Sequence, residues 1–307
     1  MLISIVLLII GFVLLVRGAD TFVDGAVSVA RRFHISPIII GTTLVAIGTS
    51  APEAAISITA ALAGSNGVSI GNIIGSNITN VFLILGLTAV IGALPIRNET
   101  KKYELPFVGS ITLLLCLLGV WFGEISRISA IMFLGLFVGF IIYTIIMAKK
   151  SNKSTTEYKK ISITETLVMI AGGITALIIG SNLIVESATD IATYLGVSDR
   201  IIGLTLVALG TSLPELVVCV AAAIKREYDM AVGNIVGSNI FNILFVLGAT
   251  AVINPLPFDS AFLMDGLVAL LAITMLMIFV SRNSCLGRVG GIIFLIAYTL
   301  YTFYLVL

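Results

Sequence analysis

The second half of this chain repeats a segment of the first half. Residues 41–96 align with residues 203–258 at a constant offset of 162 without a gap, and 28 of the 56 positions are identical. The stretch GTTLVAIGTSAPE becomes GLTLVALGTSLPE, and GNIIGSNITN becomes GNIVGSNIFN. Packing alone would favour similarity on apolar faces, but here identity is concentrated in polar, helix-breaking segments. We therefore infer a duplication whose polar segments carry the function.

The chain as a whole has the composition of a membrane protein. Hydrophobic residues make up 59% of it, charged residues 11%, and the mean hydropathy is +1.17, whereas a soluble domain carries roughly 25% charged residues. The apolar runs approach or exceed the ~20 residues that a helix needs to cross a bilayer. They lack the alternating pattern of a membrane barrel. We predict an all-α integral membrane protein whose first run is a spanning helix, not a signal peptide.

Ten hydrophobic helices are predicted, in two groups of five. Their ranges are 2–30, 36–63, 68–92, 105–122, 126–148, 164–192, 199–223, 230–254, 260–280 and 288–306. The polar stretch KKSNKSTTEYKK (149–160) separates a first repeat (1–148) from a second (161–307). Because five is odd, the second repeat must enter the membrane from the opposite side. The two repeats are then inverted about a pseudo-two-fold axis in the membrane plane.

The basic residues predict the orientation of the helices. With the N-terminus outside, inside loops would hold fourteen of them: Arg31, Arg32, Arg97, Lys101, Lys102, Lys149, Lys150, Lys153, Lys159, Lys160, Lys225, Arg226, Arg282 and Arg288. Outside loops would hold Arg127 and Arg200. Positive residues stay cytoplasmic. We therefore expect a multi-pass protein of the cell membrane with both termini outside and the 149–160 linker in the cytoplasm.

The motif GTSAPE (48–53) places a helix breaker and an acid inside a spanning helix. Pro52 cannot donate to the carbonyl of Gly48, four residues earlier, so helix 2 should be discontinuous. Such a break is tolerated at membrane depth only where protein or a wet cavity surrounds it. We expect freed carbonyls near Ala46 and Gly48 to act as oxygen ligands. The side chains of Thr49, Ser50 and Glu53 would add further oxygens.

The second copy supplies the same groups from helix 7: Ala208, Gly210, Thr211, Ser212 and Glu215. Under the inverted repeat, Glu53 and Glu215 should meet near the membrane midplane. Carboxylates, carbonyls and hydroxyls together suit calcium, which takes 6–8 oxygen ligands. A buried acid can instead be a structural group bonded to a carbonyl. Intramembrane acids are costly, however, and are usually functional.

The motif GN-I-[IV]-GSN-I-x-N adds small and amide residues. Its glycines are explained by close packing between helices. Ser76 and Asn80 are four residues apart, as are Ser238 and Asn242, so each pair should share a face and coordinate ions. We expect Asn72, Asn77, Asn234 and Asn239 to form hydrogen bonds between helices instead.

Polar residues outside the repeated segments 41–96 and 203–258, and the cysteines, have simpler interpretations. Asp20, Asp24, Glu186 and Asp190 lie late in the first and sixth helices. We interpret them as ion-paired or solvated, with Arg17 able to pair with Asp20, and the alternative is that they line an access path. Cys116, Cys219 and Cys285 have no metal-ligand spacing and are expected to be free thiols. No cofactor, nucleic acid or obligatory protein partner is indicated.

Two other classes of protein share some of these features. A cation channel also uses acidic side chains, but it needs a continuous pore, whereas broken helices in inverted repeats favour alternating access. An intramembrane hydrolase needs a catalytic dyad or a metal motif. The sole histidine, His34, lies in a predicted loop, and no HExxH motif occurs. We therefore do not expect an enzyme.

The paired motifs GTSAPE with GNIIGSNITN, and GTSLPE with GNIVGSNIFN, resemble the α-repeats of the sodium/calcium exchanger family, within the calcium/cation antiporter superfamily. The resemblance implies exchange of Ca²⁺ for several Na⁺ by a prokaryotic-type antiporter. Helices 2, 3, 7 and 8 would form the core and helices 1 and 6 would move against it. It further implies that Glu53 and Glu215 ligate both ions and that Thr49 and Thr211 serve the calcium site. Sodium sites would be completed by Ala46, Ser50, Ser76, Ala208, Ser212 and Ser238.

Some relatives, including potassium-dependent exchangers, carry an acid at the position of Asn242. Both Asn80 and Asn242 are neutral here, so we expect potassium-independent, electrogenic exchange. The GNATE-type motif of proton-coupled members does not occur. Proton-coupled or potassium-dependent antiport is the alternative. A proton could still compete for the carboxylates.

Overall fold

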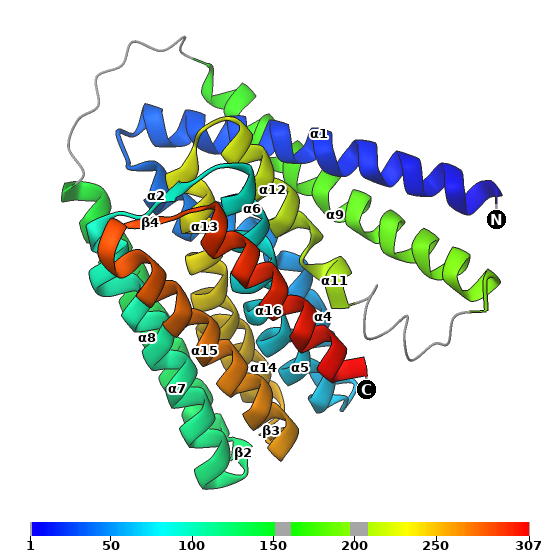
Figure 1. The fold of residues 1–307 in the computed structure, drawn as a ribbon, viewed down its shortest axis with the longest axis vertical. Helices are drawn as coiled ribbons and strands as arrows, with labels where there is room; N and C mark the ends of the chain where they lie inside the picture. The colour runs from blue at the N-terminus through cyan, green and yellow to red at the C-terminus, as the bar shows by residue number, and fades with distance from the viewer. Residues whose placement is uncertain (1, 151–160, 197–207, 307) are drawn as a thin grey trace.

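The computed structural model describes residues 2–150, 161–196 and 208–306. Nearly all of this part of the chain is helical (Figure 1). The expected helix 7 begins at residue 199, so its first part lies outside the described residues. The 149–160 linker also lies outside them, apart from Lys149 and Lys150, which end a helix.

The first half contains the following elements, with η marking π-helical segments: α1 (Leu2–Arg32), α2 (Pro37–Ile40), η1 (Gly41–Val45), α3 (Ala46–Thr49), α4 (Ala51–Leu62), α5 (Asn66–Ile78), η2 (Thr79–Leu85), α6 (Gly86–Ile91), β1 (Leu94–Pro95), η3 (Thr100–Glu104), α7 (Leu105–Phe122), β2 (Glu124–Ile125) and α8 (Arg127–Lys150). The helix expected at 105–122 thus begins earlier, because η3 continues directly into α7.

The second half contains α9 (Ile163–Tyr194), α11 (Ala208–Thr211), α12 (Leu213–Ile224), α13 (Tyr228–Phe241), η5 (Asn242–Leu247), α14 (Gly248–Ile253), β3 (Leu256–Pro257), α15 (Ser260–Asn283), β4 (Cys285–Leu286) and α16 (Arg288–Val306). The start of α9 follows from its sequence: Ser162 and Glu165 form a capping box, in which each side chain bonds the other's backbone N–H.

Within the described residues, eight helices are long and apolar enough to span a membrane, and the bent pair 37–62 makes a ninth. Nine of the ten predicted spans are therefore present. α12 has 12 residues and is too short to span a membrane by itself, and residues 197–207 before α11 lie outside the described ones, so the tenth span stays a prediction. The prediction of an all-α chain needs one small correction. Two-residue strands pair antiparallel, β1 with β4 and β2 with β3, and each pair joins the two halves of the sequence.

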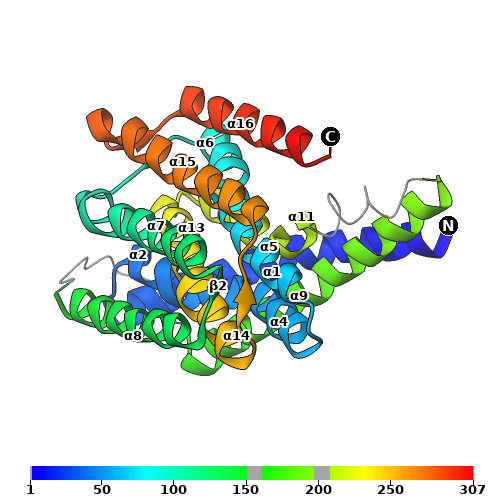
Figure 2. The ribbon, with the colours of Figure 1, turned by 90° about the horizontal axis from the view of Figure 1, so that it is seen from below.

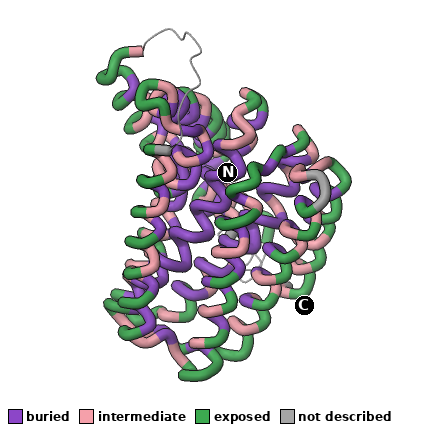
Figure 3. The backbone as a smooth tube through the Cα atoms, turned by 90° about the vertical axis from the view of Figure 1, so that its left-hand side faces the viewer, coloured by how far each residue is buried: buried purple, intermediate pink, exposed green. Residues whose placement is uncertain are grey.

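The centre of the molecule is formed by the repeated segments. In the spans 66–91 and 228–253, 78% and 83% of the most apolar stretch is buried, against 28% in α1 and in α9. Figure 3 shows this buried interior surrounded by exposed outer helix faces. α13 packs against η1 so closely that a Cβ on Gly237 would lie 2.6 Å from the Cα of Thr42. This contact leaves no space for a side chain at position 237 between α13 and η1.

The long helices α1 and α9 lie side by side and extend beyond the other helices (Figures 1 and 2). Their contact is lined with glycine, as expected where helices approach closely in a membrane. A Cβ on Gly180 would lie 2.8 Å from the carbonyl oxygen of Gly11 and from the backbone nitrogen of Leu15. Hydrogen bonds lie toward both ends, between Ser28 and Thr166 and between Ser4 and Asp190.

Candidate cation-binding site

Helix 2 is broken where the GTSAPE motif predicts a break. α3 ends at Thr49, α4 starts at Ala51, and the two parts are bent by 47°. Pro52 lies in the first turn of α4, where the missing N–H would have no helical partner anyway. Glu53 lies in the same turn, where the helix dipole stabilises a negative charge. The break therefore converts one spanning helix into two half-helices with an acid between them.

The second copy is built in the same way. α11 ends at Thr211, α12 starts at Leu213, and Glu215 lies in the first turn of α12. Glu53 and Glu215 are both completely buried. Serine residues connect each of them to the opposite half of the sequence.

The Glu215 carboxylate accepts a hydrogen bond from the Ser50 hydroxyl at 2.7 Å, and the Oγ atoms of Ser50 and Ser238 are 3.0 Å apart. In the other half, the Glu53 carboxylate accepts from Ser76 at 3.2 Å and from Ser212 at 3.3 Å, and these two hydroxyls are 3.1 Å apart. All four serines are buried. The Glu53 carboxylate thus receives hydroxyl groups from both halves, and the Glu215 carboxylate receives one from the opposite half.

Two hydrogen bonds between asparagine side chains of opposite halves lie next to the serines. Asn80 donates from Nδ2 to Oδ1 of Asn239 at 2.9 Å, and Asn242 donates from Nδ2 to Oδ1 of Asn77 at 3.1 Å. The second bond joins the residues that correspond, at the 162-residue offset, to those of the first bond. The bonds hold the NH₂ groups of Asn80 and Asn242, so their Oδ1 atoms point elsewhere. This confirms the prediction that Asn77 and Asn239 bond between helices.

Thr49 and Thr211 also interact with asparagines of the opposite half. The Thr49 hydroxyl lies 3.1 Å from Oδ1 of Asn234, and the Thr211 hydroxyl lies 3.5 Å from Oδ1 of Asn72. Asn72 donates to the Glu53 carbonyl and to Ser57. The expected interhelical role of Asn72 and Asn234 is therefore confirmed.

Four buried oxygen atoms in this cluster accept no hydrogen bond from the described residues: Oε2 of Glu53, Oε2 of Glu215, Oδ1 of Asn80 and Oδ1 of Asn242. They form two pairs related by the 162-residue offset. A buried acceptor without a partner costs roughly 1–3 kcal/mol, and more if it is charged. Four such hard oxygens, two of them on carboxylates, are the donor set that a cation takes.

The two halves differ at the broken backbone. The N–H of Ser50 bonds to the carbonyl of Ala46 at 3.0 Å, whereas the N–H of Ser212 bonds to Leu209 at 3.2 Å. The Ala46 carbonyl therefore already accepts one backbone bond, and the Thr49 hydroxyl lies 3.4 Å from it. The expectation that the break frees this carbonyl is wrong, because the N–H of Ser50, where the helix bends, still donates to it. Ala208 lies in α11, and its side chain is outside the described set.

Sequence reasoning missed one feature of the site. Asn80 lies in η2 and Asn242 begins η5, so the two matching segments of the repeats are π-helical. π-turns occur frequently at functional sites, and they rotate the side chains that follow. Nothing in the residue types distinguishes such a turn from an ordinary α-turn.

Asp20 and Asp24, which precede the repeated segment 41–96, form ion pairs at the surface. Lys225 forms ion pairs with Asp24 at 2.7 Å and with Asp20 at 3.6 Å. Arg31 pairs with Glu227 at 3.2 Å. The ion-pair interpretation of Asp20 and Asp24 is confirmed, with Lys225 as their partner. These contacts connect the end of α1 to the loop after α12.

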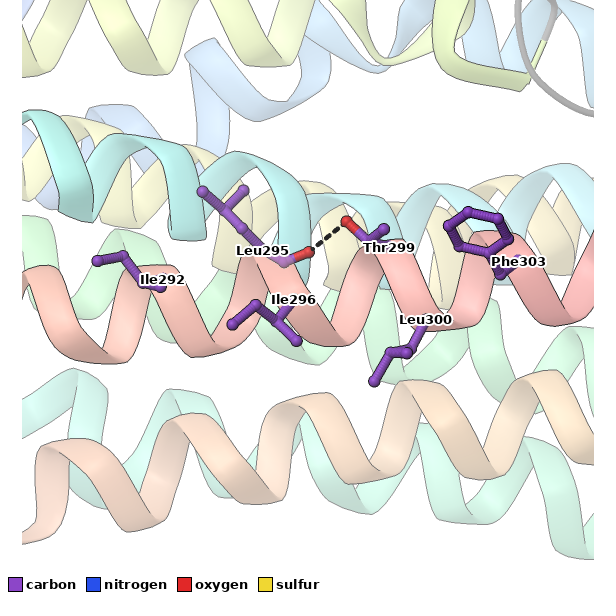
Figure 4. Close-up of a pocket in the computed structure, with 6 residues that line it drawn as sticks. All are labelled: Ile292, Leu295, Ile296, Thr299, Leu300 and Phe303. Carbon is purple, nitrogen blue, oxygen red and sulfur yellow. Dashed lines mark hydrogen bonds between the residues drawn. The ribbon is translucent and has the colours of Figure 1, made fainter.

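A separate hollow of about 280 Å³ lies along the outer face of α16 (Figure 4). It is lined by aliphatic side chains, Phe303 and Thr299, whose hydroxyl donates to the Leu295 carbonyl at 2.9 Å. The hollow therefore offers an ion no free polar group of its lining and is distinct from the buried cluster.

Comparison with known proteins is consistent with these features. The family model for sodium/calcium exchanger protein matches residues 3–146 and 165–307. The chain is 38% identical over 320 residues to the putative antiporter CaxA of Alkalimonas amylolytica, covering 99% of each chain. It is 32% identical over 351 residues to the sodium/calcium exchanger MaX1 of Methanosarcina acetivorans, again covering 99% of each. A solved structure of the sodium-calcium exchanger NCX_Mj is 34% identical and superposes with a TM-score of 0.85 over 97% of each chain.

The fold and site define a multi-pass helical membrane transporter, not an enzyme. The chain belongs to the sodium/calcium exchanger family.

Proposed function

We propose that this protein exchanges Ca²⁺ for several Na⁺ ions across the cell membrane by alternating access. The observation that carries the proposal is the set of four buried oxygens without hydrogen-bond donors on Glu53, Glu215, Asn80 and Asn242. Both carboxylates belong to the same buried cluster, which has two negative charges when they are ionised. One calcium ion neutralises such a site.

The two cations compete because they need the same oxygens. Calcium takes the four free oxygens, with Thr49 and Thr211 beside them. Sodium ions use the carboxylates together with the hydroxyls of Ser50, Ser76, Ser212 and Ser238 and the carbonyls of Ala46 and Ala208. This division between the ions rests on the family resemblance.

Exchange without leak follows from the charge of the empty site. Two uncompensated carboxylates are costly in a low-dielectric interior, so the unloaded protein resists switching between its two access states. Occupied states cross more easily. In this proposal the inverted halves supply the two access states, and α1 and α9 move against the central helices, which stay fixed. Both termini lie outside and the 149–160 linker lies in the cytoplasm.

The site also supports the absence of a potassium requirement. Asn80 and Asn242 are uncharged, so no third carboxylate remains for an additional monovalent ion once calcium has bound. With three sodium ions per calcium, each cycle carries one net charge, worth about 2.3 kcal/mol per 100 mV of membrane potential. Exchange is then electrogenic.

The test is calcium-45 uptake into proteoliposomes loaded with sodium, lithium or potassium. We expect calcium uptake only into sodium-loaded vesicles. An inside-positive potential should enhance this uptake, because sodium carries more charge out than calcium brings in. Uptake that ignores the sodium gradient would overturn the proposal. Calcium entry down its own gradient with no counter-ion would indicate a channel, and entry driven by a pH gradient would indicate proton coupling.

The site assignment has its own test. Glu215→Gln keeps the size of the side chain and removes the charge, so calcium uptake should fall by 10-fold or more. Glu53→Gln should behave in the same way, because Glu53 holds the matching position in the first half. Asp265→Asn is a matched control, since Asp265 accepts from Tyr301 at 3.0 Å, away from the cluster. Normal transport by Glu215→Gln would contradict the assignment.

A further inference from the structure

A second cavity lies between α7 and α8, apart from the cation cluster. Its volume is about 370 Å³. Gly135 and Gly139 form part of its wall, and a Cβ added at either of them would meet nothing within 4 Å. Because these glycines are four residues apart, they share one face of α8. The empty space thus follows that helix face like a groove.

One end of the cavity carries an acid. Glu104 lines it and is 8% exposed, and its Oε2 atom has no hydrogen-bond donor among the described residues. The hydroxyls of Thr100 and Tyr143 lie beside this carboxyl and interact with it. The Oε2 atom of Glu104 is nevertheless a buried acceptor without a well-placed donor. A ligand that donates a hydrogen bond to it would recover this cost.

The rest of the cavity wall is aromatic. Phe107 and Phe140 are stacked with ring centroids 6.1 Å apart, and Phe140 and Tyr143 are stacked at 6.3 Å. Faces of aromatic rings attract organic cations. They also provide apolar area for a hydrocarbon chain.

This chemistry is wrong for the transported ions. Calcium needs 6–8 oxygens, and the side chains of the lining offer one carboxylate and the hydroxyls of Tyr103 and Tyr143. Glu104 also lies outside the repeated motifs, and the position at the same offset in the second half is Gly266. A single acid beside aromatic rings instead suits a protonated amine, which donates several hydrogen bonds and carries one charge.

The polar end of the cavity lies near the membrane surface. Glu104 is four residues from the start of the span 100–122, and Tyr143 is six residues from the end of the span 127–149. At 1.5 Å per residue these positions are about 6 Å and about 9 Å inside the spans. An amphipathic molecule could place its head here and its tail along the glycine groove.

We propose that this cavity binds an amphipathic organic ammonium, with the amine on Glu104 and Tyr143 and the hydrocarbon body against Phe107, Phe140 and the two glycines. The amine can belong to a free molecule or to the headgroup of a phosphatidylethanolamine in the bilayer.

The first test measures binding of dodecylammonium to the purified full-length protein by calorimetry. Dodecyl sulfate has the opposite charge, and dodecyltrimethylammonium cannot donate a hydrogen bond. We expect dodecylammonium to bind at least 10-fold more tightly than either. Glu104→Gln should weaken its binding by 10-fold or more, and Tyr143→Phe should weaken it by a smaller factor. Equal binding to the wild type and Glu104→Gln would overturn the proposal.

Gly139→Leu is a second variant, which fills the groove and leaves Glu104 in place. It should abolish dodecylammonium binding, and sodium-driven calcium uptake without the amine reports that this variant is folded. Unchanged binding by a variant that still transports would contradict the assigned cavity. Asp265→Asn serves again as the control and should bind the amine normally.

The source of the amine is distinguished by native mass spectrometry after extraction from membranes containing both phosphatidylethanolamine and phosphatidylcholine. Phosphatidylethanolamine retained by the wild type and lost in Glu104→Gln identifies a lipid as the ligand. Glu104-dependent dodecylammonium binding without retained lipid identifies a free amine. Neither result depends on sodium coupling, so a failure here leaves the transport proposal intact.

Discussion

Ser181 on α9 donates its hydroxyl to the carbonyl of Gly210 at 2.7 Å. The residues at the same offset in the first half are Ala19 and Gly48, and alanine has no hydroxyl to donate. α9 is therefore hydrogen-bonded to the break in helix 7. α1 has no hydroxyl at the matching position that could bond to the break in helix 2.

We expect Ser181→Ala to change the maximal rate of calcium exchange about three- to ten-fold while the half-saturating calcium concentration changes less than two-fold. The variant leaves the buried Gly210 carbonyl without this donor, which costs about 1 kcal/mol or more in the present conformation. It removes no proposed ion ligand. Initial-rate measurements in proteoliposomes separate the two quantities.

Ser110→Ala is the matched control, because Ser110 is an exposed serine that bonds only within its own helix, to the Pro106 carbonyl. It should leave both quantities unchanged. If Ser181→Ala behaves in the same way, the bond plays no part in the motion of α9.

Asn77 should matter for calcium binding although its amide oxygen is already occupied. Its Oδ1 accepts from Asn242 and so fixes which end of the Asn242 amide faces the free oxygens. Residues that orient a metal ligand by a hydrogen bond typically contribute 10–100-fold in metal affinity. We predict that Asn77→Ala weakens calcium binding by about that factor, as measured by isothermal titration.

Asn239→Ala is expected to have an effect of similar size, because Asn239 orients Asn80 through the corresponding bond. Asn66→Ala offers a comparison with an asparagine that bonds the loop at 254–255. A loss of affinity common to all three variants would point to general destabilisation instead of amide orientation.

Acid should inhibit transport competitively. A proton on Glu53 or Glu215 removes the negative charge that holds the cation, so calcium affinity falls as the pH falls. For each carboxylate that must lose a proton, the half-saturating calcium concentration can rise by up to about ten-fold per pH unit. Saturating calcium should restore the maximal rate. Uptake measured at equal pH on both sides of the vesicle checks this, and an inhibition that high calcium does not relieve would speak against competition.

The ion pairs around residues 225–229 should favour the conformation seen here. Arg31 and Arg97 pair with Glu227 and Asp229 of this segment, and its Lys225 pairs with Asp24 of α1. The matching segment of the first half, 63–67, reads AGSNG and has no charge. Exposed pairs are worth about 0–1 kcal/mol each. We predict that Lys225→Gln shifts the ratio of half-saturating calcium concentrations at the two membrane faces by about two- to five-fold.

Asp24→Asn should shift this ratio in the same direction, and the double variant should add little, because the two residues form one pair. High salt should reduce the difference between the wild type and the variants. Independent, additive effects would show that the pair itself does not set the ratio.

The sequence predicted the parts of this structure that depend on local chemistry. The break at Ser50 follows from Pro52, and the second break follows from its copy at Pro214. The grouping of Glu53 with Ser212 follows from the repeat and its inferred inversion. The expected free thiols agree with Cys116, Cys219 and Cys285, which are all unpaired.

Other features could not be predicted because they depend on packing between distant residues. Arg17 is three residues from Asp20, but Asp20 pairs with Lys225, brought close by the contact of α1 with α12. The π-turns at Asn80 and Asn242 leave no trace in residue type. The Ala46 carbonyl keeps its bond because the bend falls at Ser50, a detail that motif spacing does not determine.

The bonds of Ser50 and Ser212 mirror each other, as do the asparagine bonds, but the ion pairs and the Ser181 bond occur on one side. Under the proposed mechanism, the two access states then differ in energy even with the same ion bound. Such a difference cannot alter the final ion gradients, which detailed balance fixes through the number of ions exchanged. It can determine at which face calcium is captured when it is scarce. Residues that never touch an ion could thus adapt one duplicated site to two very different solutions.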